Sequence, residues 1–139
     1  MKIKFVSTYP PTKCGIAEHA KQLAISLHNV GIVPEILEIE KPRSSNPFYF
    51  LNLARKAAKG MSKEDIIHIQ FHLGIFGEFF KISGIYIIIF LAYLKLLSKA
   101  KVVMSLHDSP SRSYAMAGRR KEKILFYYYK FIYITRRIH

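Results

Sequence analysis

The stretch that decides the expected fold is residues 2–20, which read KIKFVSTYPPTKCGIAEHA. Lys2–Ser7 is a short apolar run, as expected for a buried strand. Thr8–Gly15 contains two prolines and a glycine, which indicate a loop. From Ile16 the apolar residues recur at helical spacing, and Gly31 is expected to end the helix. The stretch therefore predicts a strand, a loop and a helix in that order.

The same alternation continues along the rest of the chain. Further strands are predicted at Val33–Ile39, Asp65–Gln70 and Lys101–Leu106, and further helices at Phe48–Lys59, Glu78–Lys99 and Arg119–Arg137. The first, third and fourth strands are nearly continuous apolar runs, which are typical of strands buried in a parallel sheet. Strands that alternate with helices predict an α/β fold, in which helices cover both faces of a parallel sheet.

Composition limits the class of protein. The chain has 139 residues, enough for one domain, and half of them are apolar, which argues against disorder. Its single cysteine, Cys14, excludes an internal disulfide framework and a cysteine-based zinc site, and it fits a reducing cytoplasm. The six histidines form no metal-binding motif, so no metal is expected.

Charge and hydropathy bear on the partners. The net charge of +13 favours polyanions, which include nucleic acid, anionic lipid and phosphorylated small molecules. The start of the chain does not have the pattern of a signal peptide. The longest apolar run, Ile82–Leu97, is shorter than the ~20 residues that cross a bilayer. We therefore expect a helix buried against the sheet rather than a membrane span.

Ligands of an open parallel sheet bind beyond the carboxyl ends of its strands, so the loops there hold the candidate residues. In the first loop, Gly15 stands where the helix begins, and Lys13 and Cys14 precede it. Exposed amides and the helix dipole favour an anion such as a phosphate at this point. The glycines of a dinucleotide fingerprint and the GK[ST] of a P-loop are missing, so an ordinary strand–helix turn stays open as the alternative.

Histidines follow two other strands. His72 comes just after the third strand and could bind a sugar hydroxyl or a phosphate, or be a solvated loop residue, whereas His68 lies within the strand as a sheet residue. His107 and Asp108 come directly after the fourth strand. A histidine there can hydrogen-bond a leaving-group or acceptor oxygen. Adjacent side chains on an extended strand point in opposite directions, so His107 and Asp108 are not assumed to act as a pair.

The last predicted helix, Arg119–Arg137, has basic residues at both ends of an aromatic run. Three interpretations stay open. It can be a core helix packed on the sheet, an interfacial helix on anionic lipid, or an aromatic platform for single-stranded nucleic acid.

Three stretches occur in an order that resembles the N-terminal domain of family-4 (group 1) glycosyltransferases. They are KIKFVSTYPP with CGIAE, then DIIHIQ, then KVVMSLHD, and together they span about residues 1–110. The resemblance implies a GT-B architecture, with two Rossmann-like domains that face each other across a cleft. It implies a retaining, metal-independent transferase without a cofactor, whose N-terminal domain receives the acceptor and whose C-terminal domain binds the nucleotide sugar. Gly15 matches the glycine that approaches the donor phosphates, and His107 matches the histidine near the reacting sugar.

The chain departs from this family at two points. Cys14 stands where the family often has the first of two glycines, and no E-x7-E element of a donor domain follows. Residues 1–139 are therefore expected to be an incomplete acceptor-side domain without transferase activity of its own. The expected location is the cytoplasm, with peripheral contact at the inner face of the membrane, and the acceptor is phosphorylated or lipid-linked. The alternative is a non-catalytic basic module that binds anionic membrane or, less expected, nucleic acid.

Overall fold

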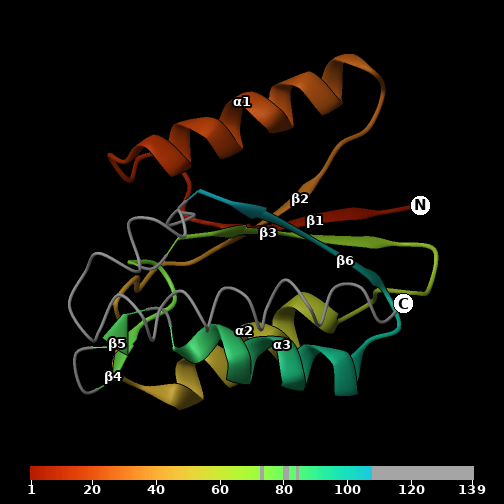
Figure 1. Ribbon diagram of the computed structural model, residues 1–139. Coiled ribbons are helices and arrows are strands. Elements are labelled where there is room, and N and C mark those ends of the chain that lie inside the picture. The colour runs from red at the N-terminus through yellow and green to blue at the C-terminus, as the bar shows by residue number, and fades with distance from the viewer. Residues whose placement is uncertain (73, 80–81, 84, 108–139) are drawn as a thin grey trace, which may run out of the picture. The chain divides into compact units, whose positions relative to one another are not determined.

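A parallel sheet organises the computed structural model shown in Figure 1. The structure describes residues 1–72, 74–79, 82–83 and 85–107, and the predictions for Asp108 and for Arg119–Arg137 lie outside them. Within the described residues, the sheet has four strands in the order β2-β1-β3-β6, and every neighbouring pair is parallel. The strands are β1 (Ile3–Ser7), β2 (Glu35–Glu38), β3 (Ile66–Phe71) and β6 (Lys101–Leu106).

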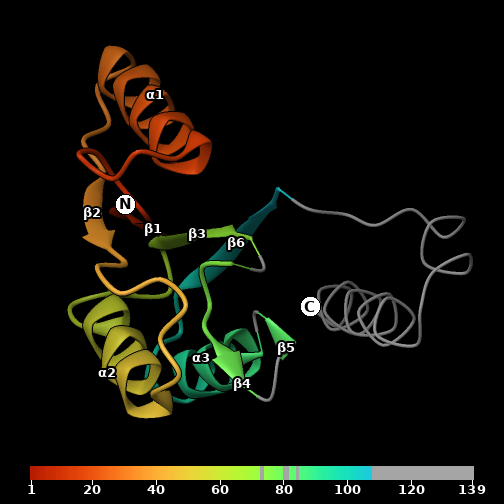
Figure 2. The same cartoon turned by 90° about the vertical axis from the view of Figure 1, so that its left-hand side faces the viewer.

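Helices cover both faces of this sheet. Helix α1 (Gly15–Asn29) lies on one face, while α2 (Pro47–Ala58) and α3 (Tyr86–Leu97) lie on the other, as Figures 1 and 2 show. The reason is the strand order. The chain moves outward from β1 to β2 and then crosses back over β1 to reach β3, and right-handed connections in opposite directions place their helices on opposite faces. The prediction of a Rossmann-like α/β fold is confirmed.

Local signals fix the first helix where the sequence predicts it. Cys14 is the N-cap residue, and its Sγ accepts a hydrogen bond of 3.3 Å from the amide of Ala17. At the other end Gly31 has a φ of +81°, and the amide of Ile32 donates to the carbonyl of Leu27 at 2.9 Å. This pairing is the Schellman arrangement that satisfies the last carbonyls of a helix.

The predicted helix Glu78–Lys99 is wrong at its beginning. Strand β4 (Glu78–Phe79) pairs antiparallel with β5 (Ile82–Ser83), and α3 begins only at Tyr86. The sequence Ser83-Gly84 contains two poor helix formers, which oppose a continuous helix through this point. An apolar run without a capping residue does not itself mark where a helix begins, and this is why the prediction extended too far.

The fourth strand is also less buried than expected. In β6, Val102, Val103 and Leu106 expose 37–42% of their surface, because β6 is an edge strand of the described sheet. The second strand is the other edge and is shorter than predicted, since Pro34 has no amide hydrogen to donate to a neighbouring strand. The two central strands, β1 and β3, carry the buried apolar positions.

An aromatic core fills the space between the sheet and helices α2 and α3. Phe76 is fully buried and its ring lies within 6.0 Å of the rings of Phe50, Phe71 and Phe90. Helix α3, which contains most of the long apolar run, also contributes to this core, since its residues Ile87 and Leu94 are buried. Among the described residues, no helix is long and apolar enough to cross a membrane.

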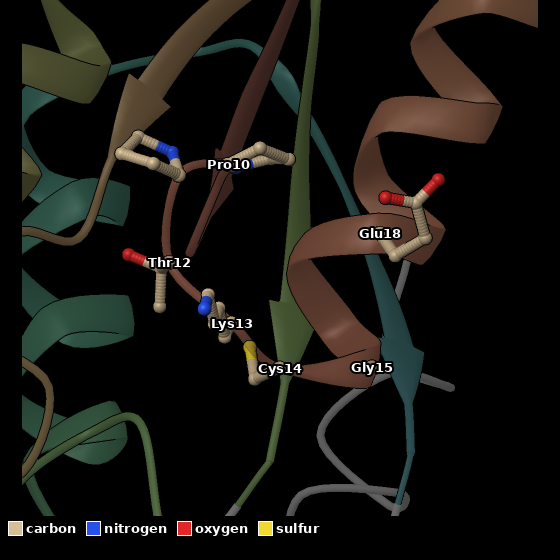
Figure 3. Close-up of a pocket in the computed structure, with 7 residues that line it drawn as sticks. Pro10, Thr12, Lys13, Cys14, Gly15 and Glu18 are labelled. Atoms are coloured by element: carbon tan, nitrogen blue, oxygen red, sulfur yellow. The ribbon is translucent and has the colours of Figure 1, made fainter.

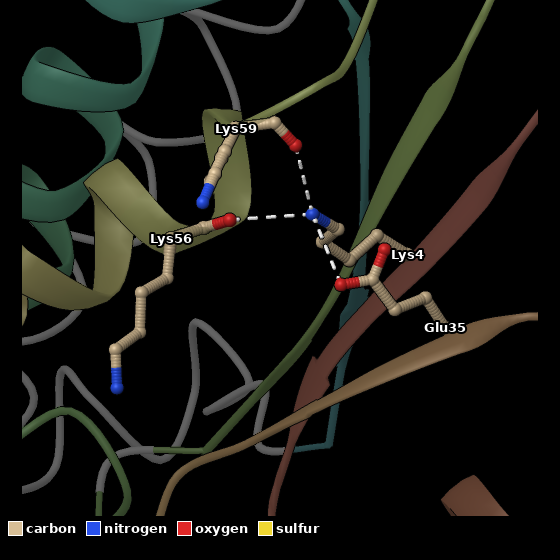
Figure 4. Close-up of polar contacts among 4 residues, drawn as sticks. All are labelled: Lys4, Glu35, Lys56 and Lys59. Atoms are coloured by element: carbon tan, nitrogen blue, oxygen red, sulfur yellow. Dashed lines mark hydrogen bonds and ion pairs between the residues drawn. The ribbon is translucent and has the colours of Figure 1, made fainter.

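A buried lysine ties α2 to the sheet. Lys4 of β1 is only 3% exposed, and its Nζ donates to the carbonyls of Lys56 at 3.2 Å and Lys59 at 3.1 Å (Figure 4). The same atom lies 3.3 Å from a carboxylate oxygen of Glu35. A cation at the carboxyl end of a helix satisfies its last carbonyls and opposes the negative end of its dipole. Lys4 is therefore a cap for α2 and not a ligand-binding residue.

Candidate functional site at the carboxyl ends of the strands

The strand order places a topological switch point between β1 and β3. The chain leaves β1 toward β2 on one side, and β3 lies on the other side, so the loops that follow these two central strands diverge. In doubly wound sheets this switch point is where ligands bind. The loop from Thr8 to Cys14 and the turn that begins at His72 stand at this edge, and His107 follows β6.

A hollow of about 490 Å³ opens beside the first loop, at the N-terminus of α1 (Figure 3). Its walls come from the loop and the first turn of the helix: Pro10, Pro11, Thr12, Lys13, Cys14, Gly15 and Glu18. The first amides of a helix have no partner within the helix, and the helix dipole favours negative charge there. Lys13 adds a positive charge to these walls and Glu18 a negative one.

The structure explains why a cysteine fits where a glycine was expected. Cys14 has extended backbone angles, φ −150° and ψ 153°, which any residue adopts. Its Sγ also shares a hydrogen bond of 3.3 Å with Oγ1 of Thr8, in addition to the bond from the helix amide. By contrast, a methyl group at Gly15 would have no other described residue within 4 Å, apart from its chain neighbours and the backbone of its own helix. Folding therefore does not require the glycine at position 15.

The floor of the site is polar on the face of the sheet that α1 covers. Val6 of β1 pairs with Ile69 of β3, and the next residues in this register are Ser7 and Gln70. Gln70 in turn pairs with Ser105 of β6. Ser7 and Gln70 are fully buried, and in the part of the chain that the structure describes neither the Oγ of Ser7 nor the Nε2 of Gln70 has a hydrogen-bond partner.

His107 stands above this floor. Its Nε2 is hydrogen-bonded to Oε1 of Gln70, and its backbone amide donates to the carbonyl of Phe71 at 3.0 Å. The ring of His19 meets the ring of His107 edge to face, with centroids 5.0 Å apart. His19 lies one helical turn after Gly15. The first turn of α1 and His107, which follows β6, are therefore on the same edge of the sheet.

His68 belongs to the same polar face, as the prediction of a sheet residue requires. Its ring packs edge to face on Phe5, and its Nε2 shares a hydrogen bond of 2.8 Å with Oγ of Ser105. Burial lowers the pKa of His68 below its ordinary value of 6.5, and repulsion from His19 and His107 lowers it further. His68 is therefore a neutral structural histidine at pH 7.

His72 has a local contact in its own turn. Its Nδ1 accepts a hydrogen bond of 3.0 Å from the amide of Gly74. A methyl group at Gly74 would lie 3.2 Å from that Nδ1 and 3.6 Å from Nε of Arg43, so the loops after β2 and β3 come together here. Whether His72 also binds a ligand stays a prediction, while Arg43 brings an additional positive charge to this edge.

Three residues at this edge do not stand out in the sequence: His19, Gln70 and Arg43. Of the three, Gln70 has the only local signal, because it is a polar residue near the end of a mainly apolar strand. His19 and Arg43 come close to the other strand ends only through the fold. Of the predicted site residues, the structure describes Lys13, Cys14, Gly15, His72 and His107.

Comparisons with known proteins give no match: no family model, no curated protein and no solved structure matches this chain. Within the residues described, no group of three or more metal-ligating side chains gathers that could hold a metal ion.

Proposed function

We propose that the chain is the acceptor-side part of a GT-B glycosyltransferase that moves a sugar from a nucleotide-sugar donor to an acceptor. The observation that carries the proposal is the meeting of two turns at one edge of the sheet. The first turn of α1, with Gly15, and His107 after β6 are linked there by the contact between His19 and His107. The resemblance of the three sequence stretches to family-4 glycosyltransferases supports the same assignment.

In the proposed chemistry, the start of α1 contacts the donor diphosphate and His107 contacts the sugar or acceptor. The acceptor hydroxyl oxygen bonds to the anomeric carbon as the bond from that carbon to the diphosphate breaks, and the hydroxyl proton passes to the departing diphosphate. The amides at Gly15, with Lys13, stabilise the negative charge on that diphosphate, and His107 binds a hydroxyl of the sugar or acceptor. Both contributions are positioning and electrostatic stabilisation.

A donor-binding domain is required to complete this site, and residues 1–139 contain no E-x7-E element that could supply it. The net charge of +13 fits an acceptor that carries phosphate or is linked to lipid. In the proposed setting the protein works in the cytoplasm and touches the inner face of the membrane peripherally.

The test is turnover by the chain joined to a donor-domain polypeptide of the GT-B kind. His107→Ala should lower kcat roughly 10²-fold, the loss typical of removing a polar group from the reacting centre. His28→Ala is the matched control, because His28 is an exposed histidine in the last turn of α1, at the end away from the site. Equal turnover by the two variants would remove His107 from the mechanism.

The net charge also favours a second candidate, a non-catalytic module that binds polyanions. Such a module predicts tight binding of the isolated chain to nucleic acid or anionic vesicles, with an affinity that falls steeply as salt is raised. Binding of this kind without sugar transfer by the joined enzyme would favour the module over the transferase.

A further inference from the structure

We propose that Gln70 is a positioning residue that fixes which ring nitrogen of His107 carries the proton. The catalytic consequence rests on the proposed function, but the tautomer itself does not. The proposal concerns a glutamine that the resemblance does not assign to the site.

The geometry starts from the contact between Oε1 of Gln70 and Nε2 of His107. An amide oxygen only accepts hydrogen bonds, so Nε2 of His107 must be the donor. In a neutral imidazole the lone pair then lies on Nδ1. A neutral His107 of this tautomer accepts a hydrogen bond at Nδ1 and cannot donate one from it.

The glutamine is well placed to enforce this choice. Gln70 is fully buried in β3, and the adjoining strands β1 and β6 carry Ser7 and Ser105 at the same level of the sheet. The amide of His107 donates to the carbonyl of Phe71, the residue after Gln70, so backbone and side-chain bonds hold the two residues together. A buried side chain between two strands has few alternative χ1 and χ2 rotamers, so the amide group of Gln70 stays beside the ring of His107.

Two other histidines face the same ring. His19 meets it from α1, and His68 of β3 is close enough that repulsion from His107 contributes to its lowered pKa. The ring of His107 is thus enclosed by His19, His68 and Gln70, and Gln70 is the one of the three that the structure shows hydrogen-bonded to its Nε2.

The test is NMR of the full chain with ¹⁵N-labelled histidine, where long-range ¹⁵N–¹H correlations identify the protonated nitrogen of each ring. The wild type should show His107 with the proton on Nε2. Gln70→Met should give a mixture of the two tautomers at His107, and Gln70→Glu should give the doubly protonated ring at neutral pH, because a carboxylate stabilises it. Gln22→Met, on the exposed face of α1, is the control and should leave His107 unchanged.

Folding is checked separately by the backbone amide signals of α2 and α3, on the other face of the sheet, which must keep their wild-type positions in each Gln70 variant used. A wild-type proton on Nδ1 of His107, or an unchanged tautomer in Gln70→Met, would overturn the proposal. In the joined enzyme, Gln70→Met should lower kcat roughly 10²-fold with little change in KM, because it misplaces a group without removing it. Full kcat in Gln70→Met would also overturn the proposal, whereas the predicted tautomers without any sugar transfer would contradict only the proposed function.

Discussion

The two faces of the sheet differ in what they bury. Toward α2 and α3, the side chains of Val6, Ile67, Ile69 and Phe71 are fully buried and apolar, and the amino group of buried Lys4 is bonded to two carbonyls and a carboxylate. Toward α1, the half of the sheet near Ile3 and Phe5 is also apolar and packs on Ala24. The half near the carboxyl ends is polar, and its members are Ser7, His68, Gln70 and Ser105.

The buried apolar positions stabilise the fold, whereas the buried polar positions near the carboxyl ends of the strands do not. A buried polar atom without a partner costs about 1–3 kcal/mol, and Ser7 and Gln70 each have such an atom among the described residues. Stability alone would favour apolar residues of similar size at both positions. Departures from the rules of stability are expected at functional sites, and here they occur at the edge of the sheet where ligands of this fold bind.

The largest expected effect is on the apolar face. Phe76→Ala removes a buried ring that contacts three other aromatic rings, and the free energy of unfolding should fall by about 3–5 kcal/mol. Urea denaturation measures it. Phe48→Ala, at a ring that is 69% exposed, is the control and should change the free energy by less than about 1 kcal/mol. Equal losses would mean that the α2/α3 face is not the main core.

A smaller effect is expected where the sheet caps α2. Lys4→Met keeps the apolar stem but removes the donor to the carbonyls of Lys56 and Lys59, and it should lower the free energy of unfolding by about 1–3 kcal/mol. Glu35→Gln weakens only a contact at a largely exposed carboxylate and should cost about 1 kcal/mol or less. A larger loss in Glu35→Gln than in Lys4→Met would contradict the capping role.

As the pH falls, the first loss of stability is expected from His68 on the polar face of the sheet. The pKa of His68 is lower in the folded chain than its ordinary 6.5, so the unfolded chain takes up the proton earlier as the pH falls. Stability from this group is present above pH 6.5 and is lost as the pH falls through the folded pKa. The slope for one proton is at most ~1.4 kcal/mol per pH unit. His68→Gln should flatten the fall in the midpoint of urea unfolding on acidification, and an unchanged slope would exclude His68 as its source.

A second loss of stability is expected from Asp65, at lower pH. Amide and hydroxyl hydrogen bonds from Ser62, together with the amide of Lys2, lower the pKa of Asp65 from 3.8 to about 2. Its contribution is present above pH 3.8 and is lost as the pH falls toward 2. Asp65→Asn should therefore destabilise the protein at pH 7 and approach the wild type near pH 2. A difference of the same size at both pH values would contradict this assignment.

The smallest expected effect on stability is at Gly15. Outside its own helix and its chain neighbours, no described residue lies within 4 Å of a methyl group placed there, and the residue is at the start of α1. Gly15→Ala should therefore change the free energy of unfolding by less than about 0.5 kcal/mol. A large destabilisation would show that the glycine serves folding and would remove it from the site. Thermal or urea unfolding measures the difference.

Much of the fold follows from local sequence signals. The apolar run of β1 and the helical spacing up to Gly31 place the first two elements correctly. The start of α3 was missed because the apolar run that contains it has no capping residue. The exposure of β6 was missed because an edge strand and a central strand can have the same apolar composition. The contact between His19 and His107 depends on strand order, which no local pattern specifies.

The most direct test of the account is an NMR titration of the full chain with inorganic pyrophosphate, following every backbone amide. If the turn before α1 binds the diphosphate of a donor, the largest shifts will be at Lys13, Cys14 and Gly15, and Gly15→Ala will weaken them. If the largest shifts fall instead on Arg55 and Lys56 of α2, or if Gly15→Ala binds as the wild type does, the polar end of the sheet is not an anion site and the proposed sugar transfer loses its basis.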